Sequence, residues 1–246
     1  MARARLAYLP LLLAIALGGC RQKPAPAPQP TGRTVLRTEG VQLTAADGWT
    51  IFGDFAGSSA AQRAVVLLHQ RNGSAGDWQA IERDLVEAGI AVLAIDQRGA
   101  GRSTGPRNGQ DAPWVTTPDI AAADAWLQAK GFAPARIGFV GASYGANNAL
   151  VYAAMRNPPP AVVLLSPGRS YHGVMVEPAA RAFRGAALVL SASGDVITEG
   201  GPELIGKTLG GRAQVVLFDG DAHGTALLAD KEQARSALLR FLKARL

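Results

Sequence analysis

The sequence predicts a three-layer α/β fold, in which helices cover both faces of a mostly parallel sheet. Two patterns predict it. Short apolar runs without polar alternation recur along the chain from about residue 34, as in strands that are buried on both faces. Between them lie segments whose apolar residues return every three or four positions, the spacing of amphipathic helices. This alternation predicts one α/β domain over residues 34–246.

The first two strands are expected to form an antiparallel hairpin. Residues 35–44 and 50–55 flank Asp47-Gly48, a dipeptide typical of tight hairpin turns. The later strands are expected to make the parallel part of the sheet. They are predicted from six apolar runs, which are residues 64–69, 90–95, 136–140, 161–165, 186–190 and 214–218.

Helices are expected between these strands. The first lies around residues 78–85, and the second starts at residues 117–119, Thr-Pro-Asp. In that start the threonine is expected to cap the helix, the proline to take its first position and the acid to face its positive end. Further helices are predicted over residues 146–156 and around residues 234–242.

A nucleophilic serine is predicted at the turn after the third parallel strand. Gly-Ala-Ser-Tyr-Gly, residues 141–145, lies between an apolar run and a helix-forming run. A G-x-S-x-G sequence at a strand-to-helix turn is typical of a nucleophile elbow, which exposes the serine hydroxyl above the sheet. A second match at residues 101–105 is followed by Pro106, so no helix can begin there. Ser143, and not Ser103, is therefore the predicted nucleophile.

The general base is chosen from three histidines. His223 lies five residues beyond the last predicted strand, among small turn-forming residues that can carry its ring over the sheet. His69 ends a strand in the turn where oxyanion-binding backbone is expected, and His172 falls in a short loop. We therefore predict that His223 activates the serine, since a hydroxyl is a weak nucleophile without a base.

The acid that orients this histidine is predicted to be Asp195. It follows the run at residues 186–190, and open α/β sheets place their ligands at the carboxyl ends of strands. Asp219 and Asp221 are competitors, but they are sequence neighbours of His223, and Asp219 is better suited to bracing the turn.

The order Ser143, Asp195, His223 together with the elbow resembles the α/β-hydrolase superfamily over residues 34–246. The chain is most similar to the small, lid-poor members of dienelactone-hydrolase-like and serine-aminopeptidase-like type. Residues 96–103, Asp-Gln-Arg-Gly-Ala-Gly-Arg-Ser, are similar to the D-x-R-G-x-G-x-S stretch after the family's fourth strand. The resemblance implies a hydrolase with a Ser-His-Asp triad.

The chain departs from that pattern in two places. His69-Gln70 stands where His-Gly is common, and Ser143 stands where true dienelactone hydrolases have cysteine. The resemblance implies that the backbone N–H of Tyr144 is one oxyanion donor. It places the other donor at Arg71, with Gln70 as the alternative.

These features imply acyl transfer to water, with hydrolysis of carboxylic esters as the expected reaction. Peptidase or amidase action of aminopeptidase type is the alternative, and a tethered binding module without turnover is a third hypothesis. About twenty residues separate the runs 161–165 and 186–190, which leaves room for a loop or one short helix and predicts a minimal lid. Arg71, Arg98 and Arg102 are hypothesised to form a positive rim for anionic acyl groups. Neither a metal nor an organic cofactor is expected.

The N-terminus is predicted to be a lipoprotein signal peptide over residues 1–19. Arg3 and Arg5 precede an apolar run at residues 6–17, which is too short to cross a membrane. Leu17-Gly-Gly-Cys20 resembles the lipobox of bacterial lipoproteins, in which the cysteine is lipidated. An ordinary signal peptide with a chance cysteine is the alternative.

Residues 20–33 are predicted to be a tether. The segment contains four prolines at alternate positions and is expected to be extended. The protein is therefore expected to be exported and anchored in the bacterial cell envelope through Cys20. The chain has 25 Lys and Arg against 19 Asp and Glu, and because they are scattered we expect no nucleic-acid partner.

Overall fold

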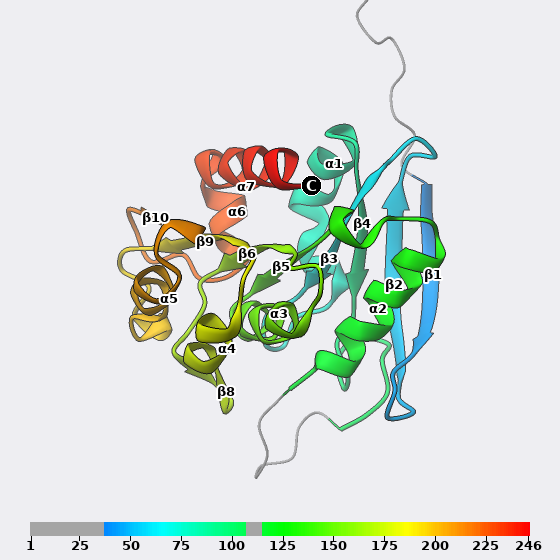
Figure 1. Ribbon diagram of the computed structural model, residues 1–246, viewed down its shortest axis with the longest axis horizontal. Coiled ribbons are helices and arrows are strands. Elements are labelled where there is room, and N and C mark those ends of the chain that lie inside the picture. Colours follow the sequence, from blue (N-terminus) through cyan, green and yellow to red (C-terminus); the bar gives the residue numbers. More distant parts are fainter. Residues whose placement is uncertain (1–36, 107–114) are drawn as a thin grey trace, which may run out of the picture. The chain divides into compact units, whose positions relative to one another are not determined.

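The computed structural model describes residues 37–106 and 115–246, which belong to the compact unit Thr34–Leu246 (Figure 1). The predicted signal peptide, Cys20 and the tether lie outside the described residues. Among the helices within the described ranges, none has the length and apolar character needed to cross a membrane.

An eight-stranded sheet runs through the unit in the order β1-β2-β4-β3-β5-β6-β9-β10. The pairs β1–β2 and β2–β4 are antiparallel and all other neighbours are parallel. Its strands are β1 Arg37–Thr44, β2 Thr50–Gly57, β3 Arg63–Leu68, β4 Ile90–Ile95, β5 Ile137–Ala142, β6 Ala161–Leu165, β9 Ala186–Ala192 and β10 Ala213–Phe218. The predicted hairpin and the six later strands are thus confirmed, and where their ends differ within the described residues, the shift is one or two residues.

Helices cover both faces of this sheet, which confirms the three-layer α/β fold (Figure 1). One face carries α2 Thr117–Ala129, α3 Tyr144–Met155, α4 Val176–Ala182 and α5 Gly201–Leu209. The other carries the 3-10 helix η1 Ala75–Trp78, α1 Gln79–Glu87, α6 Ala226–Asp230 and α7 Glu232–Arg245. Three more 3-10 turns complete the helical segments, and they are η2 Pro134–Arg136, η3 Val196–Thr198 and η4 Gly210–Arg212.

The segment between β6 and β9 contains α4 and a small two-stranded sheet. The strands β7 Ser170–Tyr171 and β8 Val174–Met175 pair antiparallel to form it. The single short helix agrees with the predicted minimal lid, whereas the hairpin was not predicted. Two residues are too short a strand to leave an alternating pattern in the sequence.

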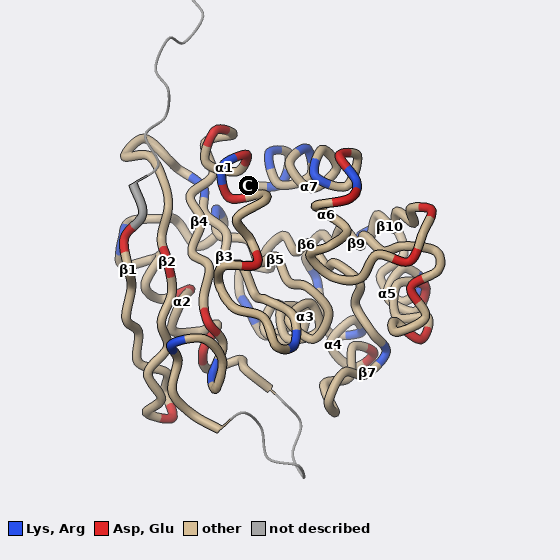
Figure 2. The backbone as a smooth tube through the Cα atoms, turned by 180° about the vertical axis from the view of Figure 1, so that it is seen from behind, with Lys and Arg blue, Asp and Glu red and all other residues tan. Residues whose placement is uncertain are grey.

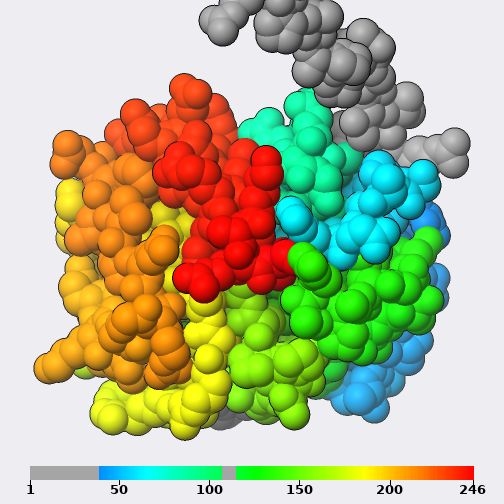
Figure 3. All heavy atoms as spheres, turned by 45° about the horizontal axis from the view of Figure 1, so that its top comes forward, coloured from blue at the N-terminus to red at the C-terminus, as the bar shows by residue number. Residues whose placement is uncertain are grey.

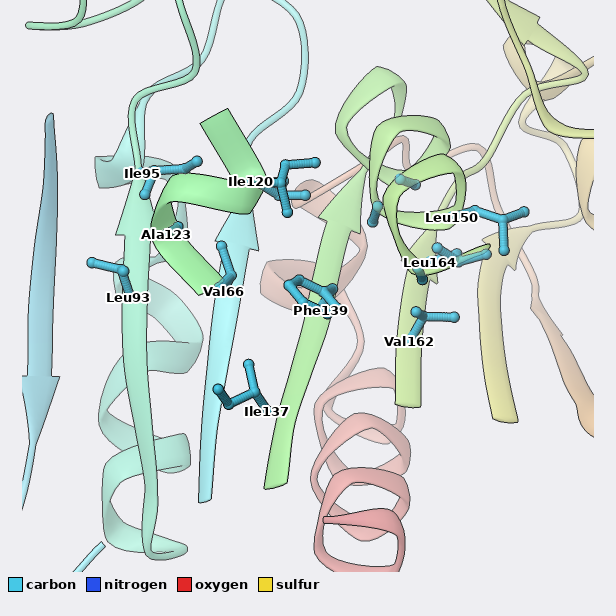
Figure 4. Packing of buried hydrophobic residues seen from close by; sticks show 14 of the residues in the cluster. Val66, Leu93, Ile95, Ile120, Ala123, Ile137, Phe139, Leu150, Val162 and Leu164 are labelled. Carbon is cyan, nitrogen blue, oxygen red and sulfur yellow. The ribbon is translucent and has the colours of Figure 1, made fainter. Parts of the chain in front are cut away.

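The continuous apolar runs arise because successive side chains of each central strand enter different cores. Val66 of β3 faces the core under α2 and α3, which also contains Phe139 of β5 and Leu164 of β6 (Figure 4). Its neighbours Val65 and Leu67 face the opposite core beneath α1 and α7. Both layers bury apolar surface, which is the main favourable contribution to folding.

Charged residues are concentrated on the helices and loops and are absent from most of the central strands. The strands β4, β5, β6 and β9 contain no Asp, Glu, Lys or Arg, and Figure 2 shows the charged residues on the helices and loops around them. Figure 3 shows the C-terminal residues at the centre of one face, between the α1 region and the segments near β10. Thus α7 closes that face over the sheet.

One prediction about the start of α2 is wrong and another is confirmed. Thr117 is not the cap of α2, because the N-cap is Thr116, whose hydroxyl donates to Oε1 of Gln97 instead of capping the helix. Asp119 lies in the first turn of α2, as predicted, where it is fully buried and pairs with Arg98.

The strand β10 is less buried than predicted. It is the edge strand of the sheet, and Val215 and Leu217 are exposed. An edge strand has a neighbour on one side only, so an apolar run does not guarantee burial on both faces.

Candidate active site

The turn at residues 141–145 has the strained geometry expected of a nucleophile elbow. Ser143 has φ 53° and ψ −122°, a conformation that a residue with a side chain adopts only when its surroundings impose it. A Cβ on Gly141 would lie 2.3 Å from the carbonyl oxygen of Gly145, and one on Gly145 would lie 2.4 Å from that of Leu68. Both glycines are therefore required by close backbone approach between β5, α3 and the end of β3.

Three loops bring Ser143, His223 and Asp195 together. The Oγ of Ser143 lies 2.8 Å from Nε2 of His223, and Nδ1 of the same ring lies 2.9 and 2.8 Å from the two carboxylate oxygens of Asp195. Because Nδ1 faces only carboxylate acceptors, it carries the proton in the neutral ring, and Nε2 is then the acceptor for the serine hydroxyl. The arrangement suits proton removal from Ser143.

Asp195 is held in a buried position at the end of β9, with its side chain 1% exposed. The loops after β9 and β10 meet at Gly194, whose N–H donates to the carbonyl of Gly220 at 2.8 Å. A Cβ on Gly194 would lie 2.8 Å from that oxygen, so glycine permits the approach. The competing carboxylates Asp219 and Asp221 are exposed, and the carboxylate that reaches the imidazole is that of Asp195.

His69 lies behind the site and not in it. Its Nε2 accepts the N–H of Gln97 at 3.0 Å, and its Nδ1 donates to the carbonyl of Gln70 at 2.7 Å. The ring therefore links the loops after β3 and β4, which agrees with the structural role predicted for it.

The segment after β4 is scaffolding. Oδ1 of Asp96 accepts the N–H of Ala75, and its Oδ2 accepts the N–H of Arg102. A Cβ on Gly101, which has φ +52°, would lie 2.4 Å from the Asp96 carboxyl group. Ser103 also belongs to this turn, and its hydroxyl donates to the carbonyl of Asp96 at 2.5 Å. The second G-x-S-x-G match is therefore a loop, as predicted.

The hypothesis of a rim of three arginines is wrong for two of them. Arg98 pairs with Asp47 and with buried Asp119. Burial raises the pKa of the Asp119 carboxyl, and the Arg98 guanidinium opposes that rise. Arg102 pairs with Asp54 and Asp96. Both guanidinium groups are engaged in ion pairs away from Ser143, because the loop that carries them folds against β2.

A cavity of about 470 Å³ opens above Ser143 and His223. Its walls come from the turn after β3, the β7–β8 hairpin and the loop after β9, and they include Gln70, Arg71, Tyr144, Tyr171, His172, Ile197 and Glu199. Thus the candidate oxyanion residues all border the cavity that contains the serine. Tyr144 is the first residue of α3, whose N-terminus favours developing negative charge.

Two side chains in the β7–β8 hairpin have shifted pKa values. Burial and the positive charge of Arg71 lower the pKa of His172, so its ring stays neutral down to a lower pH than an ordinary histidine does. Burial and the negative charge of Asp195 raise the pKa of Tyr171, whose ring meets that of His223 edge-on at 6.1 Å. Within residues 37–106 and 115–246, no three His, Cys, Asp or Glu side chains are grouped to hold a metal ion.

Ser166 is a site residue that the sequence analysis missed. It directly follows β6, is fully buried, and its Oγ accepts the N–H of Gly224 next to His223. The available signal was its place at the carboxyl end of a predicted strand, the same signal that identified Asp195.

Comparisons with known proteins agree with the α/β-hydrolase fold. The model of the family described as serine aminopeptidase, S33 matches residues 59–223. The esterase Pf2001 of Pyrococcus furiosus superposes with a TM-score of 0.72 at 18% identity, covering 85% of this chain and 93% of that one. A dienelactone hydrolase of Anabaena variabilis superposes with a TM-score of 0.68 at 18% identity, covering 85% of this chain and 96% of that one. At such identities these two likenesses show the fold alone.

One curated relative is closer in sequence. An uncharacterized protein of Mycobacterium tuberculosis is 34% identical over 151 residues, which is 58% of this chain. The chain spans about half the length of that relative, 51%.

Proposed function

The chain belongs to the serine aminopeptidase S33 family of α/β hydrolases, and from this premise we propose that it cleaves carboxylic esters through a Ser-His-Asp triad. The single observation that carries the proposal is the unbroken series of hydrogen bonds from Asp195 through His223 to Ser143. A buried carboxylate, an oriented imidazole and a strained serine at a helix N-terminus are the parts that acyl transfer needs.

In the proposed reaction, Ser143 Oγ attacks the ester carbonyl carbon while Nε2 of His223 takes the hydroxyl proton. The resulting oxyanion is stabilised by the backbone N–H of Tyr144 and by one from the turn of Arg71 and Gln70. Asp195 stabilises the imidazolium, which then gives its proton to the leaving alkoxide as the C–O bond breaks. Water then attacks the acyl carbon while Nε2 of His223 takes one of its protons, and that proton passes to Ser143 Oγ as the bond to the acyl group breaks and the acid is released.

Ester cleavage is favoured over amide cleavage by the shape of the site. The cavity is bounded by the β7–β8 hairpin and by the turns after β3 and β9, and the segment between β6 and β9 is too short for a large lid, which suits small or exposed acyl groups. Several structural neighbours are named as esterases, which supports the same choice. Aminopeptidase-type amide cleavage is the second candidate, because the description of the matching family names it.

A panel of nitrophenyl esters and aminoacyl anilides tests the choice between them. We expect short acyl esters to be turned over and the anilides to remain intact, because an alkoxide or phenoxide leaves more easily than an amine. The measurement is kcat/KM for each substrate on the domain that begins at residue 34. Higher kcat/KM on the anilides would replace the esterase proposal with the peptidase one.

We also propose that the protein acts in the bacterial cell envelope, held by a lipid on Cys20. The support is the charged leader, its short apolar run and the Leu-Gly-Gly-Cys sequence at residues 17–20. Cells fed an alkyne fatty acid should incorporate it into the full chain and show the protein in the membrane fraction. The Cys20→Ala variant should lose the label, and equal labelling of both proteins would rule the anchor out.

A further inference from the structure

The loop that carries His223 is held by side chains from two distant turns. It follows β10, and Gly220 and Gly224 on either side of the histidine have φ of +111° and +60°. Such a loop gains no stability from helix or strand hydrogen bonds at the histidine itself. Its position must therefore be set by contacts with other parts of the chain.

Two consecutive amides after His223 provide these contacts. The N–H of Gly224 donates to Oγ of Ser166 at 3.0 Å, and the N–H of Thr225 donates to Oε1 of Gln70 at 2.9 Å. Ser166 follows β6 and Gln70 follows β3, so the two bonds connect the histidine loop to two other strand ends. We call this pair of acceptors the histidine-loop clamp.

Ser166 is itself fixed in place. It is fully buried and has φ +48°, which is strained for a residue with a side chain. Its N–H donates to the carbonyl of Leu190 at 2.8 Å, and its own carbonyl accepts the hydroxyl of Tyr171 at 3.2 Å. The backbone of Ser166 is thus held from β9 and from the β7–β8 hairpin, which leaves its hydroxyl at a defined point.

The carboxamide of Gln70 lies close against the histidine loop at Gly224. A Cβ on Gly224 would lie 1.9 Å from Oε1 of Gln70. The carbonyl of Gln70 also accepts the N–H of Gly73 and the Nδ1–H of His69, so its backbone belongs to a tight turn. The carboxamide therefore projects from a rigid support into the histidine loop.

We propose that Gln70 and Ser166 are positioning residues for His223, an inference that rests on the function proposed above. Asp195 fixes Nδ1, but the ring must also keep Nε2 within reach of Ser143 and then of the leaving group. The clamp fixes the backbone directly after the histidine, and so limits displacement of the ring as it gains and loses a proton. A displacement of about 1 Å can cost about a hundred-fold in rate.

The test compares Ser166→Ala and Gln70→Met, each of which removes one acceptor with little change in size. We expect each variant to lose about ten-fold in kcat and the pair together about a hundred-fold, with KM little changed. The rate of fluorophosphonate labelling at Ser143 should fall in parallel, and this readout needs no knowledge of the natural substrate. If Ser166→Ala does not fold, Ser166→Gly removes the same hydroxyl and relieves the strain at φ.

Ser103→Ala is the matched control. Ser103 is also a buried serine whose Oγ accepts a backbone N–H, that of Phe52, but it lies away from the histidine loop. We expect a loss of thermal stability similar to that of Ser166→Ala, with unchanged kcat and labelling rate. A purely structural role for the clamp predicts instead that Ser166→Ala, like Ser103→Ala, loses stability without losing kcat.

Gln70→Glu is the rescue variant, because it retains an oxygen acceptor for the N–H of Thr225. We expect it to recover the kcat that Gln70→Met loses, because the hydrogen bond from the N–H of Thr225 is restored. Wild-type kcat in both Gln70→Met and Ser166→Ala would overturn the clamp while leaving the triad intact. Turnover that survives Ser143→Ala would instead overturn the proposed function.

Discussion

Replacing Ser143 with alanine is expected to lower kcat for esters by about five to six orders of magnitude and to abolish fluorophosphonate labelling. The variant removes the hydroxyl that lies 2.8 Å from Nε2 of His223. The oxyanion donors and the binding cavity remain, so a small residual acceleration over water is expected. The measurements are single-turnover kinetics, which should lose the acylation burst, and peptide mapping of the labelled protein.

Ser103→Ala provides the control for this experiment, because Ser103 occupies the same place in the second G-x-S-x-G match. Its hydroxyl accepts from Phe52 at 2.8 Å and serves the turn after β4. Its loss should cost about 1–3 kcal/mol of stability and leave kcat unchanged. Label that maps to any residue other than Ser143, or undiminished turnover by Ser143→Ala, would contradict the proposed mechanism.

The second large effect is expected for Asp195→Asn, with kcat falling by about 10⁴-fold. The amide is close in size to the carboxylate, so the backbone bonds of the loop are retained. An amide is neutral, however, and its NH₂ group can favour the wrong tautomer of His223. The measurement is kcat across pH, with KM as the check that the cavity is intact.

Asp221→Asn is the matched control, since Asp221 is two residues from His223 yet exposed. Solvent screening makes an exposed carboxylate a weak influence on the ring, so kcat should stay near that of the wild type. If Asp221→Asn lost more activity than Asp195→Asn, the acid would have been assigned to the wrong loop.

The sequence predicted those parts of the fold that depend on short, repeated patterns of apolar residues. The continuous run at residues 161–165 forms β6 with the predicted boundaries, because its side chains are buried alternately in the two cores on the opposite faces of the sheet. The same rule overstated the burial of β10, since a run of apolar residues carries no information on which strand is at the edge. Likewise, Thr117 was predicted to cap α2 because the sequence does not show which of the adjacent residues Thr116 and Thr117 begins the helix.

The candidate site was predictable to the extent that each residue follows a strand. Ser143, Asp195 and His223 all lie just beyond carboxyl strand ends, and parallel strands bring such ends to one edge of a sheet. The arginine hypothesis was wrong for Arg98 and Arg102, because their partners Asp47, Asp54 and Asp119 are far away in sequence.

The sequence by itself determined the α/β class, the elbow and the order of the three candidate catalytic residues, since these depend on local spacing and residue type. Only the tertiary structure decided that His223 reaches both Asp195 and Ser143, and that Gln70 and Ser166 hold the loop behind it. The physical reason is that hydrogen bonds between loops depend on positions set by the packing of the whole sheet. A glutamine or a serine in a turn has many possible partners, and the fold selects among them.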